Sequence, residues 1–349
     1  THALIESDEA AFKTISTFVD AKAVVVTNLF RDQLDRYGEV THTLENIKIG
    51  ISHSPNATLC LNADDSLCTS IHDDFENPVI FFGVNTPIYT SRVEELSDAP
   101  YCIRCKSEYV YDYVTYGHLG GYRCPNCGYH RPQPQVHVTK VLRTDDEHSE
   151  VIFEENGKQV PASIHLPGGY NIYNACACMA AASVMGIDME LAAKSLSSFA
   201  CGFGRMEKFR INDADVRMIL IKNPAGCNQV LNFLTQRSEP FVFAACLNDR
   251  AQDGKDVSWI WDAGFERLFE SGQRKGRVIV SGTRAEDMRL RLKYAGADED
   301  SVEIIRDVKQ LTDAIAGCTG EVCVMPTYTA MLPLRAELAA RVGKGEFWK

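Results

Sequence analysis

The sequence lacks any long apolar run. None of its 349 residues belong to a stretch approaching the roughly 20 consecutive apolar residues that a membrane-spanning helix needs. The first residues, THALIESDEAAF, carry neither the basic leader nor the apolar segment of a signal peptide. We therefore expect a cytoplasmic protein without an integral membrane segment.

The usual sequence marks of phosphate binding are also scarce. Asp and Glu number 47 against 36 Lys and Arg, so the formal net charge is −11. An acidic surface repels the phosphates of nucleic acids, and we expect no nucleic-acid partner. No phosphate-binding loop of the GxxxxGK[ST] type occurs, so the residues alone do not show a nucleotide site.

Short apolar runs between helical patterns indicate an α/β protein. The length exceeds what one hydrophobic core comfortably serves, which favours two domains. The runs AKAVVVT and PVIFFGV are typical of strands that are buried on both faces of a parallel sheet. Beyond residue 204 such runs alternate with helical segments, which predicts a second, mainly parallel sheet. Glycines in FACGFGRMEKF place the boundary between domains 1–203 and 204–349.

Four of the 13 cysteines stand apart by their C-x2-C-x18-C-x2-C spacing: Cys102, Cys105, Cys124 and Cys127. Thiolates at this spacing converge tetrahedrally on one Zn2+ ion, and a closed four-thiolate shell leaves no position for water. We therefore expect a structural zinc ribbon, inserted at about residues 100–134. A redox-active cysteine pair is the weaker alternative.

Polar residues gather at three other places. Asn171 and Asn174 share one face at the start of an apolar helix, where they either contact a ligand or Asn171 caps the helix. Lys222 follows a strand in KNPAGCNQV, where Pro-Ala-Gly is equally consistent with a simple turn. The loop LNDRAQDGKDVSWIWD holds several carboxylates that either orient a base or a cation, or form a solvated acidic loop.

Read together, these segments resemble the Mur ligases, and most closely the MurT-type subunit of lipid II isoglutaminyl synthase. The resemblance spans nearly the whole chain and is carried by IESDEAAF, VVVTNLFRDQLDRYGEV, CIRC with CPNC, GGYNIYNACA, GRMEKF, KNPAGCNQV, DGKDVSWIWD and MPTYTAML. It implies a Mur ligase-like central ATPase domain with an inserted zinc ribbon, followed by a Rossmann-like α/β C-terminal domain. Mur ligases begin the central domain with a GTNGKT-type loop, which these residues lack, so we expect a further amino-terminal portion before residue 1. The alternative is a protein that does not hold the phosphates of ATP in the usual way.

The activity that the resemblance implies is ATP-dependent amidation of the D-glutamate α-carboxylate in the lipid II stem peptide. The product is D-isoglutamine, and the intermediate is an acyl phosphate. A partner glutamine amidotransferase would supply the ammonia, and the chain would work on lipid II at the inner face of the cytoplasmic membrane. The implied cofactors are ATP, Mg2+ and structural Zn2+.

The resemblance also implies roles for residues of the ligase site. Glu6 is a candidate magnesium ligand, and Asp32 and Asp35 organise the adjacent loop. From its own place at the carboxyl end of a strand, Lys222 adds a cation to the candidate catalytic residues. The residues that would contact the nucleotide are Asn171, Asn174 and, from the domain join, Arg205.

At the partner interface, Asp256 is expected to complete the Cys-His pair of the glutaminase, with Asp253 and Asp262 as second choices. One position departs from the Mur ligase pattern, and at a second position the modification found in many Mur ligases is not assigned. Gln33 stands where many Mur ligases carry a histidine, and Lys48 has about the spacing of their carbamylated lysine.

Two other functions compete with this one. The first is a Mur-type ATP-dependent ligase that joins an amino acid to a carboxylate without a glutaminase partner. The second is a non-catalytic zinc-ribbon binding module, for example for nucleic acid. The acidic balance argues against the second, as does the dilution by tyrosines of the cations around the cysteines, which are Arg104, Lys106, Arg123 and Arg131.

Overall fold

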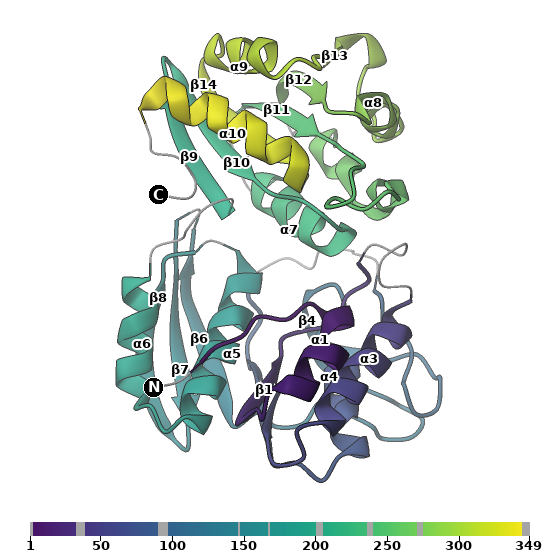
Figure 1. Ribbon diagram of the computed structural model, residues 1–349, viewed down its shortest axis with the longest axis vertical. Coiled ribbons are helices and arrows are strands. Elements are labelled where there is room, and N and C mark those ends of the chain that lie inside the picture. Colours follow the sequence, from purple (N-terminus) through teal and green to yellow (C-terminus); the bar gives the residue numbers. More distant parts are fainter. Residues whose placement is uncertain are drawn as a thin grey trace. The chain divides into compact units, whose positions relative to one another are not determined.

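A computed structural model describes residues 3–343 except 33–38, 90–96, 146, 167, 200–204, 236–239 and 271–274, and only the backbone of Arg205 and Lys275. The chain forms two compact units (Figure 1). Unit 1 comprises Thr1–Arg31 and Tyr37–Ala200, and unit 2 comprises Asp32–Arg36 and Cys201–Lys349. Within the described ranges, no helix has the length and apolar character needed to cross a bilayer.

Unit 1 contains a six-stranded sheet with the strand order β1-β2-β3-β6-β7-β8. The first four strands in this order run parallel, and β7 and β8 are antiparallel to their neighbours. The two apolar runs expected as strands form β1 and β3, as predicted. The strands are β1 (Ala23–Val26), β2 (Thr58–Asn62), β3 (Val79–Val84), β6 (Val136–Thr144), β7 (Ser149–Glu155) and β8 (Lys158–Ile164).

The longest helix of unit 1, α5 (Gly169–Val184), packs on this sheet (Figure 1). Ile172, Cys176 and Met179 recur every three or four residues, so they lie on one face and are buried in the same core as the strands. The helix begins after Gly168, whose φ of +94° favours glycine. The other helices are α1 (Glu9–Ile15), α3 (Val40–Ser52), α4 (Ser66–Ser70) and α6 (Met189–Ser198), with 3-10 turns η1 (Ser16–Phe18) and η2 (Ile71–Asp74).

Between β3 and β6 the chain forms a small module with a sheet of its own. Its antiparallel hairpin consists of β4 (Val110–Tyr116) and β5 (Leu119–Arg123). Tyr109 and Tyr122 pack with Cys102 and Cys124 in a separate small core. We call residues 100–134 the cysteine module.

Unit 2 contains the second sheet, with the strand order β13-β12-β11-β14-β10-β9. All neighbouring strands are parallel except β9, so the predicted alternation of strands and helices has produced a mainly parallel sheet. The strands are β9 (Arg205–Ile211), β10 (Ala214–Ile219), β11 (Phe241–Cys246), β12 (Lys275–Ser281), β13 (Val302–Ile304) and β14 (Gly320–Pro326). The helices are α7 (Pro224–Thr235), α8 (Ala285–Tyr294), α9 (Val308–Ala316) and α10 (Tyr328–Val342), with 3-10 turns η3 (Ser258–Asp262), η4 (Phe265–Leu268) and η5 (Glu299–Ser301).

The segment KNPAGCNQV corrects one interpretation of the sequence. Pro-Ala-Gly is not an isolated turn, because Pro224 is the first residue of α7. Proline suits this position because an N–H group on the first helical residue would have no acceptor within the helix, so its absence costs no hydrogen bond. Asn223 supports the start of the helix, since its Oδ1 accepts a hydrogen bond from the N–H of Gly226 at 2.8 Å.

Candidate functional site

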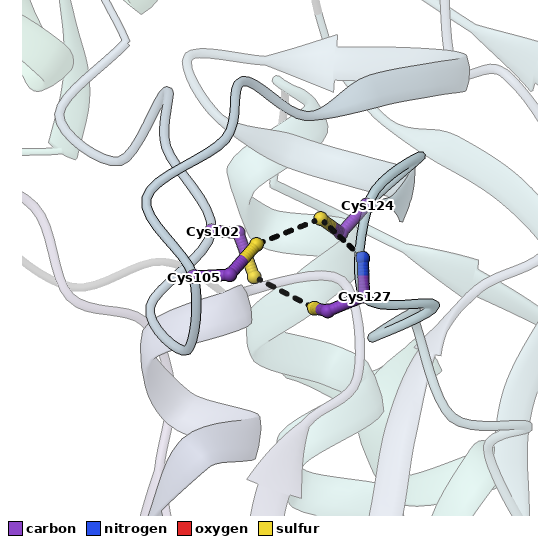
Figure 2. A group of neighbouring side chains, drawn as sticks. All are labelled: Cys102, Cys105, Cys124 and Cys127. Carbon is purple, nitrogen blue, oxygen red and sulfur yellow. Dashed lines mark hydrogen bonds between the residues drawn. The ribbon is translucent and has the colours of Figure 1, made fainter.

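The four cysteines of the module converge at one point (Figure 2). Their sulfur atoms all lie within 4.8 Å of one another, with 3.6 Å from Cys102 to Cys127 and 3.4 Å from Cys105 to Cys124. A Zn2+ ion bound by four thiolates at about 2.3 Å requires sulfur separations of about 3.8 Å. The four thiols converge as the spacing predicts, and their arrangement is compatible with a Zn2+ ion bound by four thiolates.

The pKa values of two of these thiols are shifted in ways that bear on the binding of a metal cation. Hydrogen bonds from Ser107, the backbone N–H foremost, lower the pKa of Cys105 to about 5. The backbone N–H of Tyr129 favours the thiolate of Cys127, but desolvation and the neighbouring thiols raise the pKa of Cys127 to about 12. Thiolates this close repel one another, and a bound dication removes that repulsion. Metal binding is therefore expected to release protons.

Hydroxyl groups and an ion pair join the cysteine module to the rest of unit 1. Thr69 of α4 has its Oγ1 2.5 Å from the hydroxyl of Tyr122 and 2.8 Å from that of Tyr129. Arg104 donates to both carboxylate oxygens of Asp73, and its guanidinium lies 4.3 Å from the ring centre of Tyr129. Arg104 is thus engaged within the protein, which supports the argument against a nucleic-acid surface.

A buried carboxylate that the sequence analysis missed lies directly after β2. Asp64 accepts hydrogen bonds from Arg131 Nε and from the hydroxyl of Tyr173, both at 2.6 Å, and from the N–H of Val84 at 3.1 Å. Burial raises the pKa of Asp64, while the charge of Arg131 acts against this rise. The sequence pattern placed Arg131 among the cations around the cysteines. It instead forms a largely buried ion pair with the core of unit 1.

The next residue, Asp65, is also fully buried. Its carboxylate accepts hydrogen bonds from the N–H groups of Leu29 at 2.7 Å and Leu67 at 2.9 Å, and lies 3.4 Å from Nε2 of His118. Burial opposes ionisation, but His118 and these N–H groups lower the pKa of Asp65 below its ordinary value. The signal in the sequence was the pair of acids after the apolar run TLCLN, the same pattern that drew attention to the loop after residue 247.

Two residues predicted for the ligase site lie together in unit 2. Nζ of Lys222 donates a hydrogen bond to Oδ2 of Asp32 at 2.8 Å. The Lys222 side chain is 59% exposed, whereas that of Asp32 is 19% exposed. Glu6 is exposed in the segment before α1 of unit 1. Gln33 and Asp35 lie outside the described residues.

The two asparagines predicted to contact the nucleotide lie on one face of α5. Nδ2 of Asn174 donates to Oδ1 of Asn171 at 3.3 Å, and Asn171 is buried. The alternative that Asn171 caps this helix is wrong, because the capping residue is Gly168 and Asn171 lies within the first turn. Arg205 is the first residue of β9, and its side chain is outside the described part of the structure.

The acidic loop after β11 separates its carboxylates into different environments. Asp253 is buried and accepts hydrogen bonds from the N–H and the hydroxyl of Thr329. Asp256 is half-buried and accepts a hydrogen bond from the N–H of Ser258 at 2.8 Å. Asp262 is the last residue of η3. Asp253 is therefore bound inside unit 2, while Asp256 retains access to the surface.

Lys48, the position considered for carbamylation, makes two ion pairs. Its Nζ lies 2.8 Å from Asp74 and 3.1 Å from Glu45. Partial burial lowers the pKa of Lys48, but the hydrogen bonds and charges of Asp74 and Glu45 raise it by more, so the net shift is upward. Carbamylation requires the neutral amine, so these contacts favour the unmodified ammonium.

Comparison with known proteins gives consistent matches. Residues 220–331 match the family model described as MurT ligase C-terminal. The chain is 32% identical to the lipid II isoglutaminyl synthase (glutamine-hydrolyzing) subunit MurT of Streptococcus pneumoniae, over 97% of this chain and 74% of the relative. It is 31% identical to the subunit of that name from Staphylococcus aureus strain COL, over 96% of this chain and 74% of the relative.

Among solved structures, the fold is similar to that of a pseudomurein peptide ligase type C from Methanothermus fervidus. The TM-score is 0.74 at 19% sequence identity, and the match covers 95% of this chain. It covers 65% of the ligase, so this chain spans slightly less than two thirds of that protein's length. The structural likeness shows a Mur ligase-like α/β fold, and the identity to the curated relatives confirms the resemblance seen in the sequence motifs. The chain belongs to the family of MurT subunits of lipid II isoglutaminyl synthase.

Proposed function

We propose that this chain is the ligase subunit of an ATP-dependent, glutamine-hydrolysing lipid II isoglutaminyl synthase. The observation that carries the proposal is the 32% identity to the pneumococcal MurT subunit over 97% of the chain. The reaction is amidation of the D-glutamate α-carboxylate in the lipid II stem peptide to D-isoglutamine. Because that substrate is lipid-linked, the enzyme acts at the inner face of the cytoplasmic membrane.

In this proposal each compact unit has its own role. The central ATPase domain covers residues 1–203 and includes the zinc ribbon at about 100–134, and the C-terminal domain covers residues 204–349. The mainly parallel sheet of unit 2 supports a Rossmann-like description of the second domain. The four converging thiols support a structural Zn2+ ion, because a closed thiolate shell has no open position for a reactant.

The chemistry requires activation of a carboxylate. Transfer of the γ-phosphoryl group of ATP to a carboxylate oxygen gives an acyl phosphate. Neutral ammonia then attacks the acyl carbon, a C–N bond forms, the C–O bond to the phosphate breaks, and inorganic phosphate leaves with the proton that the nitrogen loses. Bound Mg2+ supplies charge neutralisation on the phosphate oxygens. Protonated ammonia has no lone pair for this attack, which is why delivery within a protein complex is favoured.

Residues of this chain can meet these requirements. Asp32 orients the ammonium group of Lys222 through the 2.8 Å hydrogen bond, and Lys222 stabilises the negative charge that develops during phosphoryl and acyl transfer. Glu6 is assigned to the magnesium ion. The residues assigned to the nucleotide are Asn171, Asn174 and Arg205.

Ammonia is assigned to a partner glutaminase that uses a cysteine nucleophile and a histidine. We assign Asp256 as the acid that completes this Cys-His pair across the interface. Its carboxylate is half-buried, and it accepts a hydrogen bond from the N–H of Ser258 in the same loop. Asp253 is a weaker choice, since its carboxylate is buried against Thr329.

The test combines the full natural chain with its cognate amidotransferase, lipid II, ATP and glutamine, and follows the amidated stem peptide by mass spectrometry. The wild type should amidate lipid II. Asp256→Asn should lose glutaminase activity by a factor of about 10² to 10⁴, as expected when the acid of a catalytic triad is removed. Ammonium chloride at mildly alkaline pH should restore amidation by this variant, because its ligase site is unchanged.

Two further variants sharpen the result. Asp262→Asn tests the neighbouring acid, and Asp300→Asn, at an exposed position in η5, is the matched control. Failure of the wild-type complex to amidate lipid II despite bound ATP would contradict the proposed function. Loss of activity in Asp256→Asn without rescue by ammonium would leave the function intact but remove Asp256 from the glutaminase site.

A further inference from the structure

The segment that follows β1 is held by successive contacts within unit 1. Nδ2 of Asn62 donates to the carbonyl oxygen of Thr27 at 2.8 Å. The N–H of Leu29 donates to Asp65 at 2.7 Å, and that of Arg31 donates to Asp98 at 2.9 Å. Such side-chain contacts to the backbone hold a loop more tightly than solvent would.

The residue between these anchors, Phe30, lies against the tip of the β4–β5 hairpin. The ring of Phe30 stacks on that of Tyr116, with 5.6 Å between the ring centres. The centre of the His118 ring lies 4.6 Å from the centre of the Phe30 ring. Gly117, between them, has φ of +54°, and a Cβ atom there would lie 2.6 Å from Cε1 of Phe30. The hairpin tip therefore approaches Phe30 as closely as a residue without a side chain permits.

The same tip reaches the carboxylate that anchors Leu29. His118 is fully buried, and its Nε2 lies 3.4 Å from Asp65 Oδ1. The other oxygen of Asp65 accepts the Leu29 N–H. The tip of the β4–β5 hairpin thus contacts both Phe30 and Asp65, the residue that binds the N–H of Leu29.

These contacts lie on both sides of the first cysteine pair. Asp98, which holds Arg31, precedes Cys102, and the hairpin tip lies between Cys105 and Cys124. Asp98 thus lies just before the cysteine module, and the two cysteine pairs on either side of the hairpin tip converge in the cluster.

We propose that the cysteine module is a clamp that sets the position of residues 29–31, with His118 and Gly117 as positioning residues. Asp32, whose carboxylate bonds Lys222, is the next residue in the chain. We expect the module thereby to fix the residues that lead into Asp32 along the chain, and so to affect the reaction. This last step rests on the proposed function, whereas the clamp itself is a property of unit 1.

The test is the Gly117→Ala substitution in the full natural chain bound to its amidotransferase. The new methyl group pushes Phe30 away from the tip. Gly157→Ala is the matched control, because Gly157 also has a positive φ, of +80°, but nothing lies within 4 Å of its Cβ position. Both variants carry similar backbone strain, so only the displacement of Phe30 distinguishes them.

The first readout is hydrogen exchange of the amides of residues 27–31. We expect exchange about tenfold faster in Gly117→Ala than in Gly157→Ala, at equal melting temperature and equal zinc content. Removal of the metal with a chelator should accelerate exchange in the same segment of the wild type. Equal exchange in the two variants would overturn the clamp.

The second readout is the kinetics of lipid II amidation supplied with ammonium chloride. Displacement of a positioned loop should lower kcat by about tenfold or more while KM for ATP changes by less than about twofold. Faster exchange with an unchanged kcat would overturn the positioning role. If the wild-type complex does not amidate lipid II at all, the proposed function fails, and the exchange measurement by itself decides the clamp.

Discussion

The carboxyl edges of the two sheets are organised around the same kind of residue. In unit 1, Asn62 at the end of β2 binds the carbonyl oxygen of Thr27, which follows β1, and accepts from the N–H of Asp64. In unit 2, the backbone N–H of Asn248, after β11, donates to the hydroxyl of Thr327. The side-chain amide of Asn248 donates to the hydroxyl of Thr329 and accepts from the N–H of Thr283. Each asparagine thus joins the end of its own strand to a neighbouring segment through its side-chain amide.

The partners of the nearby carboxylates differ. In unit 1, Asp64 and Asp65 contact the cationic or titratable side chains of Arg131 and His118, both from the cysteine module. In unit 2, Asp253 contacts the start of α10 within the same unit. The edge in unit 1 therefore depends on an inserted module and its cysteine cluster, while the edge in unit 2 is built from its own elements.

The strongest way to break this comparison is to remove one cysteine of the cluster. Cys124→Ser should abolish cooperative unfolding of unit 1 and leave that of unit 2 in place. The apparent binding free energy of structural zinc, about 10–16 kcal/mol, equals or exceeds the stability of a typical domain. Calorimetry and hydrogen exchange resolved by unit measure the effect.

The control for this prediction is Cys178→Ser, since Cys178 is an exposed cysteine outside the cluster. It should leave both transitions unchanged. If Cys124→Ser destabilised the two units equally, the dependence of unit 1 alone on the cluster would be wrong.

A smaller difference is expected from removing one partner of a buried carboxylate in each unit. Arg131→Met leaves Asp64 buried without its cation and should cost about 3–5 kcal/mol. Thr329→Val leaves Asp253 without a hydroxyl donor and should cost about 1–3 kcal/mol. Urea denaturation, followed by probes placed in each unit, measures both free energies of unfolding.

The double variant Asp64→Asn with Arg131→Met sharpens the result, because it also removes the carboxylate charge of Asp64, which the single variant leaves buried without a cation. It should recover part of the loss. Equal costs of Arg131→Met and Thr329→Val would contradict the view that unit 1 depends more on charged partners from the module.

The smallest effect concerns acid. Burial acts to raise the pKa of Asp65 in the folded state, but His118 and the backbone N–H groups lower it by more, so the net shift is downward. The stabilising contribution of Asp65 is therefore complete above the pKa in the unfolded state, about 3.9. That contribution is lost as the pH falls below about 4 through the folded pKa. Asp64, with its raised pKa, acts in the opposite direction.

The difference between the wild type and Asp65→Asn therefore isolates Asp65. The urea midpoint of unit 1, measured between about pH 5 and pH 2.5, should fall more steeply in the wild type than in this variant. Parallel profiles would remove Asp65 as a source of acid sensitivity.

Much of the fold was predictable from local patterns. The two continuous apolar runs form β1 and β3, and the apolar helix predicted to contain Asn171 and Asn174 forms α5. The failures are also local in origin. Pro-Ala-Gly suits both a turn and the first turn of a helix, and an asparagine near a helix start suits both the cap and the first turn. Sequence spacing cannot distinguish these, because the choice depends on where the neighbouring chain leaves the strand.

The candidate sites divide in the same way. The sequence by itself was enough to predict the cysteine cluster, because its C-x2-C-x18-C-x2-C spacing is typical of a four-thiolate site and each C-x2-C pair occupies one short turn. Only the tertiary structure decided the environment of Asp64 and Asp65. Tyr173, which donates to Asp64, lies 109 residues further along the chain, and such a contact follows from how strands and helices cross rather than from any local preference.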